Sequence, residues 1–223
     1  MSPSTAKSAR PAKGDLESVR LEATRDGDRL ELAVDRDTGF LRFGPDPMMD
    51  LEIAVPEELE IDRVETRNGG LEVSEVGGGP TLETRNGAID AVDVDDDLAV
   101  ETRNGDVEID GVAGDLTVDA RNGAITAEAV DGALSIGTRN GEVEVGDVRG
   151  DVDVETRNGD VDIAAPSSDL ALDVETDGGD VTLEGIDGVD VEGSESFRTT
   201  VGDGSRRLEV TTRNGDVTVR GEE

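Results

Sequence analysis

The chain has no cysteine, histidine, tryptophan or tyrosine, and only three phenylalanines among its 223 residues. Without cysteine it has no disulfide bond, no thiol nucleophile and no thiolate metal site. Nucleophile–base pairs built on histidine or cysteine are excluded, and no tyrosine or tryptophan is present to stack a sugar. Carboxylates are abundant, but they recur periodically, as on a solvated face. We therefore expect no enzymatic activity, no catalytic residue, no cofactor, no metal and no small-molecule substrate.

Lysine is almost absent as well. Lys7 and Lys13 are the only two, and the 55 acidic residues outnumber the 21 basic ones, which gives a formal net charge of -34. This composition is typical of cytoplasmic proteins of extreme halophiles, in which molar salt screens the self-repulsion of the chain. The acidic body would repel phosphates, so nucleic acid is not an expected partner.

Long hydrophobic runs are also missing. No stretch is long enough to span a membrane, and the N-terminus lacks the apolar segment of a signal peptide. These absences predict a cytoplasmic protein in a high-salt cytoplasm. Residues 1–15 contain Lys7, Arg10 and Lys13, and we interpret them as a flexible basic tail that contacts an anionic membrane or a partner weakly.

The dominant feature that is present is one tetrapeptide, Thr-Arg-Asn-Gly. It occurs six times, and a variant with alanine in place of threonine occurs at Ala120–Gly123. From Arg67 to Arg157 the arginines of these motifs are spaced by 18 residues every time. A fixed short period indicates that each repeat is one structural unit stacked on the next.

Apolar residues form columns when the chain is written in rows of 18. The four columns begin at Val64, Leu71, Val73 and Val76, and their members are valine, leucine, isoleucine or alanine. Spacing by two within a row predicts strands with one buried face, and each row holds two such strands separated by turns. The expected fold is all-β: a single-stack parallel β-solenoid with 18-residue coils, right-handed favoured, and irregular β caps.

The departures from this period set the expected domain organisation. After the basic tail, residues 16–63 form an N-terminal β cap, with strands over Leu30–Val34 and Leu51–Val55. Residues 64–191 form the regular solenoid, although two residues are inserted within Ala164–Ser168. Residues 192–223 form a degenerate coil and a C-terminal cap, in which Val217 and Val219 close the end of the stack.

Asparagine and glycine form the corner of each coil. Asparagine tolerates left-handed backbone angles, and glycine adopts them without a steric penalty. In a solenoid the asparagine side chains of successive coils stack and form hydrogen bonds along the axis. We therefore predict a structural turn ladder that consists of Asn68, Asn86, Asn104, Asn122, Asn140, Asn158 and Asn214.

The arginine beside each corner asparagine needs a separate explanation, because like charges on neighbouring strands repel each other. Acidic residues two positions before the arginine, such as Glu83, and three positions after it, such as Asp106, make an alternating acid–base lattice plausible. The other interpretation is an interaction stripe for a ligand or partner. That stripe consists of Arg67, Arg85, Arg103, Arg121, Arg139, Arg157 and Arg213.

Several short motifs carry little weight. Asp37–Gly39 matches the aspartic protease tripeptide but lacks the preceding apolar residues and a second copy. Ser4–Lys7 fits S-x-x-K by chance, and the adhesion-type tripeptide Arg149–Asp151 is explained by a turn. A calcium-binding β-roll is not favoured, because its double glycine is missing.

The chain resembles the DUF4097 β-strand-repeat family, often labelled adhesins. The resemblance rests on Leu51–Pro56, the Thr-Arg-Asn-Gly series and Leu208–Val219, and it covers residues 30–219. It implies a β-solenoid without established catalytic residues. The coil length, the lack of aromatics and the tail are also similar to bactofilins and bactofilin-like proteins of haloarchaea, which polymerise end to end into scaffolds.

These observations favour a non-enzymatic scaffold that associates with itself through its terminal coils, in the manner of a bactofilin. The open hydrogen-bonding edge at each end of a solenoid is the basis of this expectation. The alternative is a cell-surface adhesin-type or ligand-binding module that uses the face carrying the arginines and asparagines.

Overall fold

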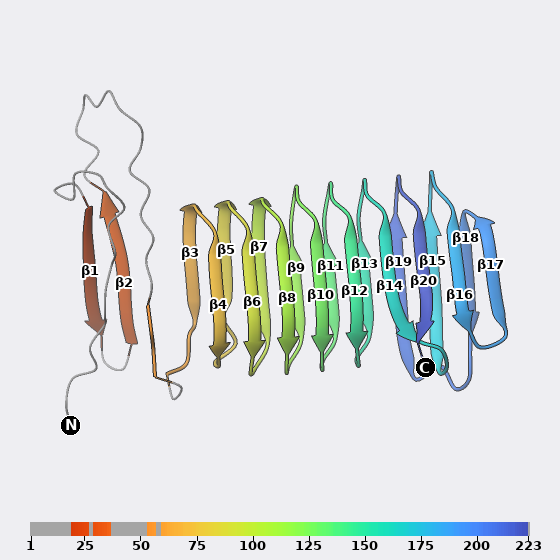
Figure 1. Cartoon of the computed structure of the whole chain (residues 1–223), viewed down its shortest axis with the longest axis horizontal. Coiled ribbons are helices and arrows are strands. Elements are labelled where there is room, and N and C mark those ends of the chain that lie inside the picture. The colour runs from red at the N-terminus through yellow and green to blue at the C-terminus, as the bar shows by residue number, and fades with distance from the viewer. Residues whose placement is uncertain (1–18, 27–28, 37–52, 57–58, 223) are drawn as a thin grey trace. The chain divides into compact units, whose positions relative to one another are not determined.

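The computed structural model describes residues 19–26, 29–36, 53–56 and 59–222, and it divides into two units, Met1–Pro56 and Glu57–Glu223. Strands are the regular elements of the described part (Figure 1), which holds no helix long and apolar enough to cross a membrane. The predicted tail, the Asp37–Gly39 tripeptide and residues 40–52 lie outside the described residues.

The described part of the first unit is an antiparallel hairpin. Strand β1 (Val19–Asp26) pairs with β2 (Arg29–Arg36), in register from Val19 opposite Arg36 to Asp26 opposite Arg29. The predicted strand over Leu30–Val34 lies within β2 and is confirmed. The predicted strand that ends at Pro56 is wrong in its described part, since residues 53–56 are irregular and Ile53 is 46% exposed. None of the described strands pairs with this segment, and proline has no N–H to donate.

The second unit is a solenoid of two facing sheets, which confirms the predicted β-solenoid fold. The first sheet contains nine strands, whose order in space is β3 (Arg63–Asn68), β5 (Thr81–Asn86), β7 (Leu98–Asn104), β9 (Leu116–Asp119), β11 (Leu134–Gly137), β13 (Val152–Glu155), β19 (Arg206–Thr212), β15 (Leu170–Thr176) and β18 (Ser196–Thr200). The second sheet contains β4 (Leu71–Val76), β6 (Ile89–Val94), β8 (Val107–Val112), β10 (Ile125–Val130), β12 (Val143–Val148), β14 (Val161–Pro166), β20 (Val217–Glu222), β16 (Val181–Ile186) and β17 (Val189–Ser194).

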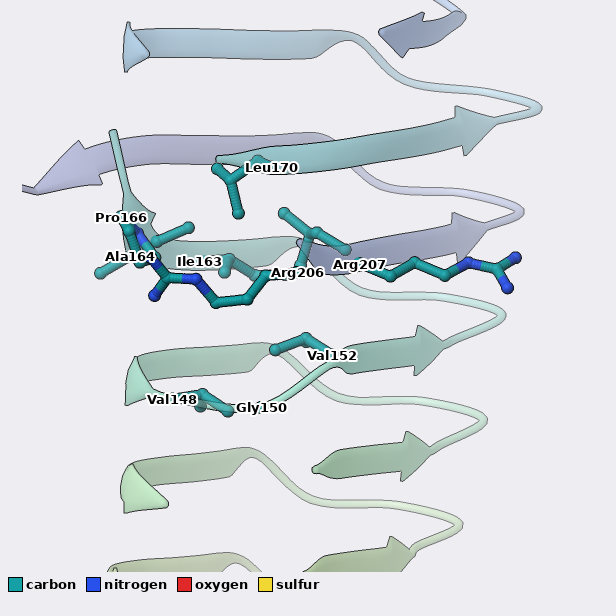
Figure 2. A pocket seen from close by; sticks show the side chains of 11 residues that line it. Val148, Gly150, Val152, Ile163, Ala164, Pro166, Leu170, Arg206 and Arg207 are labelled. Carbon is teal, nitrogen blue, oxygen red and sulfur yellow. The ribbon is translucent and has the colours of Figure 1, made fainter. Parts of the chain in front are cut away.

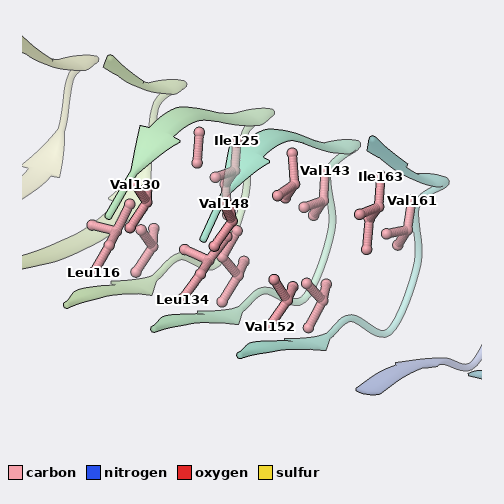
Figure 3. Packing of buried hydrophobic residues seen from close by; sticks show 14 of the residues in the cluster. Leu116, Ile125, Val130, Leu134, Val143, Val148, Val152, Val161 and Ile163 are labelled. Carbon is pink, nitrogen blue, oxygen red and sulfur yellow. The ribbon is translucent and has the colours of Figure 1, made fainter. Parts of the chain in front are cut away.

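One strand from each sheet makes a coil, and successive coils of the regular array pair in parallel with a register shift of 18 residues. Leu98 lies opposite Leu116, and Ile125 lies opposite Val143. The predicted apolar columns point between the sheets, where Figure 3 shows side chains of the two sheets packed against each other. Burial of each such aliphatic side chain contributes roughly 1.5–3 kcal/mol. The core is therefore continuous along the stack without any tyrosine or tryptophan.

A left-handed residue near the end of β4, β6, β8, β10, β12 and β16 explains why two buried positions are three residues apart in these strands. Asp147, between buried Val145 and Val148, has a φ of 48°, and Ala129 in the preceding coil has a φ of 56°. Both are skipped in the strand pairing. This residue turns the following valine back into the core, as the extra residue of a β-bulge does. The aliphatic pattern alone predicts the burial but not this backbone conformation.

The C-terminal coil is not at the end of the stack, so the predicted closure by Val217 and Val219 is wrong. Strand β19 lies between β13 and β15, and β20 lies between β14 and β16 (Figure 1). The end of the stack is formed by β17 and β18, which pair in antiparallel fashion with β16 and β15. The C-terminal coil thus fills a position between the coil of β13 and β14 and the coil of β15 and β16, which we call the slot. Its repeat pattern matches this position, so the order of the coils in space differs from their order in the chain.

The two inserted residues allow the chain to step over this slot. The regular connection from Val148 to Val152 is four residues long. Counted from the paired residues Val145 and Ile163, the chain reaches Val152 after seven residues but the equivalent Leu172 only after nine. Four residues span at most about 14 Å. Crossing between sheets about 10 Å apart while advancing two strand positions of about 4.8 Å requires nearly the same length. The longer connection therefore leaves room for β19 and β20.

We predict that deletion of Ser167 and Ser168 expels the C-terminal coil, because the shortened connection can no longer pass over it. Hydrogen exchange should show loss of amide protection across residues 206–222, with protection retained in β5–β12. Replacement of the same two serines by alanine keeps the length and serves as the control. Unchanged protection of residues 206–222 in the deletion variant would contradict this account of the insertion.

Candidate functional site

The corner that joins the first sheet to the second carries most of the repeated residues. It follows the first-sheet strands and lies along the upper edge of the second unit in Figure 1. The asparagines of this corner pair with one another in parallel bridges from Asn104 to Asn122, Asn140, Asn158 and Asn214. The corner is therefore part of the same regular lattice as the strands.

The seven asparagines form one continuous file of side-chain hydrogen bonds. Each amide nitrogen donates to the side-chain oxygen of the asparagine in the preceding coil, at 2.7–2.9 Å, from Asn86 through Asn214. Asn122 also donates to the carbonyl oxygen of Arg103 at 3.2 Å. The file crosses from Asn158 to Asn214 without a break, although these residues are 56 positions apart.

Close backbone approach requires the glycine after each asparagine of the file from Asn86 onward. A Cβ atom added to Gly123 would lie 2.1 Å from the carbonyl oxygen of Gly105, and one added to Gly141 would lie 1.8 Å from that of Gly123. These φ values of 138° and 157° are also rare for residues with a side chain. The corner therefore has space for glycine alone.

The threonine that opens the tetrapeptide points inward beneath the corner. Thr84 is 3% exposed and donates to the carbonyl oxygen of Gly69 at 3.2 Å, and Thr176 makes the equivalent bond to Gly215 at 3.0 Å. Ala120 occupies the same place in its coil, so the hydroxyl group is not required. Sequence reasoning assigned no role to this threonine, although its alternation with the exposed arginine indicates an inward side chain.

The arginines form an exposed column beside the asparagine file, which we call the arginine column, and every member is exposed. Among the described residues, only Arg213 in this column forms an ion pair, with 3.8 Å between its Nε and Asp177 Oδ2. The expected acid–base lattice along the column is therefore wrong. Asp106, Asp160 and Asp216 instead accept backbone N–H groups of the adjacent coil at 2.9 Å, so the corner uses these carboxylates to satisfy its backbone.

The opposite corner uses aspartate in the same way. Asp97 and Asp115 each accept the backbone N–H of the residue 18 positions later, at 2.8 Å, and Asp151 accepts that of Arg207. In the described part of the chain no group of three or more acidic side chains could hold a metal ion. These aspartates therefore support the turns.

A small hollow lies where the C-terminal coil enters the stack, and Figure 2 shows its lining. Val148, Ile163, Leu170 and Leu208 contribute apolar surface, and Arg206 lies beside them. Its volume of about 10 Å³ is close to the minimum that holds one water molecule. A hollow of this size has no room for a substrate.

We predict that Asn122→Ala destabilises the solenoid by about 1–3 kcal/mol. The substitution removes the hydrogen bond that Asn122 donates to Asn104 and the one that it accepts from Asn140, and it leaves the side-chain groups of these neighbours without partners. Asn68→Ala is the matched control, since Asn68 is the first member of the file and accepts only from Asn86. Urea unfolding of both variants measures the difference. An equal loss in both would contradict a cooperative file.

A family model described as Toastrack DUF4097 matches residues 8–220. Searches of the curated proteins and of the solved structures found no match. The family match covers nearly the whole chain, and it confirms the resemblance that the Thr-Arg-Asn-Gly repeats indicate. The chain therefore belongs to the Toastrack DUF4097 family.

Proposed function

We propose that this protein is a non-enzymatic scaffold whose copies associate side by side, with the arginine column of one copy lying along an acidic column of another. The observation that carries the proposal is that Arg67, Arg85, Arg103, Arg121, Arg139 and Arg157 are exposed and have no acidic partner among the described residues. Such a line of cations on a body of net charge -34 favours a partner that carries a matching line of anions.

The second sheet offers that matching line. Its first outward column contains, from coil to coil, the acidic column Glu72, Asp90, Glu108, Glu144 and Asp162, with Thr126 between Glu108 and Glu144. Glu72, Asp90, Glu108 and Glu144 are exposed. Both columns repeat once per strand spacing of about 4.8 Å. Successive charges of one copy therefore keep step with those of another over many coils.

The end of the stack that β17 and β18 form favours lateral over end-to-end association. A continuing parallel solenoid needs parallel strands at both ends, but β17 and β18 run antiparallel to their neighbours, and the pairing of β17 with β16 contains register shifts. Irregular edge pairing of this kind blocks further strand addition. The proposed scaffold thus differs from the end-to-end polymers of bactofilins, and its contact lies on the side of the stack.

The composition supports a high-salt setting for this contact. Two bodies of net charge -34 repel each other at long range, and this repulsion is screened when the Debye length falls to about 3 Å at 1 M salt. Contacts between arginine and carboxylate at hydrogen-bond distance are less affected. We propose that association occurs in the cytoplasm of a halophile.

We predict that R103E/R121E/R139E abolishes association, and that D90R/E108R/E144R does the same, because each places like charges against each other. A mixture of the two variants should associate again with reversed polarity. Sedimentation velocity in 1 M KCl measures all three samples. The off-column variant R149E/R206E/R207E makes the same change in net charge as R103E/R121E/R139E and should behave as the unmodified protein.

A monomeric unmodified protein at every salt concentration would overturn the lateral contact, as would equal association of the column and off-column variants. In that case the uniform cationic line favours the second candidate, an adhesin-type or ligand-binding module for a linear polyanion. Long-chain polyphosphate is a suitable probe. Its binding should be lost in R103E/R121E/R139E and retained in the off-column variant.

A further inference from the structure

The C-terminal coil occupies a slot that the rest of the chain forms on both sides. Strand β19 pairs in parallel with β13 and β15, and β20 pairs in parallel with β14 and β16. Asn158 and Asn214, neighbours in the asparagine file, are 56 residues apart, whereas neighbours in the regular array are 18 apart. The slot is therefore completed by contacts of long sequence separation, and these form late in folding.

The coil matches both walls of the slot through buried residues. Leu208 lies opposite Val152 on one side and Leu172 on the other, and it is 2% exposed. Val217 lies opposite Val161 and Val181 and is fully buried. None of these pairings depends on the coil belonging to the same molecule as the walls. The C-terminal coil of a second copy presents the same side chains in the same register.

A single short loop joins the coil to the rest of the chain. This hinge, Val201–Ser205, contains Gly202 and Gly204 at φ values of 62° and 65°. It is held against Asp169, itself at a φ of 61°, whose side chain accepts the N–H of Asp203 at 3.2 Å. Short hinge loops favour exchange of the attached element between copies.

We propose that the C-terminal coil, residues 206–222, exchanges between two copies, so that β19 and β20 of each fill the slot of the other. The exchanged dimer keeps every strand pairing of the monomer, and the hinge extends to connect the two copies. It forms when two chains fold at high concentration, because the slot stays open until a coil of either copy reaches it. This exchange does not require the arginine column, so each proposal can fail while the other holds.

Because the chain contains no cysteine, introduced cysteines can form disulfide bonds only with each other. Glu155 of β13 and Thr211 of β19 are register partners, and both are exposed. Neighbouring strands place their Cα atoms within the range that a disulfide bridges. The E155C and T211C variants are mixed, unfolded, refolded together at high concentration and oxidised. Exchange should convert monomer into a disulfide-linked heterodimer whose linked peptides join positions 155 and 211.

The matched control is a mixture of T117C and S135C, which are register partners on β9 and β11 and are also exposed. These strands are connected to further coils at both ends, so their exchange requires the whole array to be shared. The doubly substituted E155C/T211C chain, refolded at low concentration, verifies by an intramolecular disulfide that the substitutions permit folding. A yield of heterodimer well above that of the control mixture, and rising with protein concentration, supports exchange. A yield equal to that of the control overturns it.

Discussion

The close approach of backbones at the Asn–Gly corner is the constraint on which the rest of the second unit depends. A Cβ atom added to a corner glycine would lie about 2 Å from the carbonyl oxygen of the corner glycine in the neighbouring coil. Backbones this close allow the coils to stack in only one register along the axis. The asparagine file then connects the corners, and each hydrogen bond repeats the geometry of the one before it. Because this register is fixed, residues 18 positions apart become neighbours, and the apolar columns meet as a core.

The same register places like charges next to each other. Arg103 and Arg121 lie in adjacent coils, as do Asp90 and Glu108 of the second sheet. A globular fold scatters charges over its surface, but a strict repeat collects them into lines. Asp106 and Asp160, three residues after an arginine of the column, accept backbone N–H groups and form no ion pair with the column among the described residues. The arginine column is thus a by-product of a structural repeat, and it is also a surface with a defined period.

Much of this architecture could be predicted from the sequence, because the repeat expresses one interaction many times. The 18-residue spacing indicates the coil, and Val118 and Ile136 are buried as their columns require. The left-handed position was not predicted. Asp93, Gly111 and Asp147 occupy it and are residue types that tolerate this conformation, but Ala129 occupies it in another coil and does not indicate it. The place of the C-terminal coil was not predicted either. Its valines and asparagine fit any position in the stack, and only the two-residue insertion before Leu170 carries information about the order.

The position of the C-terminal coil has a consequence for how the chain is made. Coils from β3 to β14 pair with the coil synthesised just before them, so each can dock as it leaves the ribosome. The slot beside β13 and β14 is different, because its occupant is translated only after β15–β18, although it pairs with β13 and β14. The stack therefore remains incomplete until residues 206–222 have been translated. Any domain fused after residue 223 would emerge from the side of the stack, between two coils, and not from its tip.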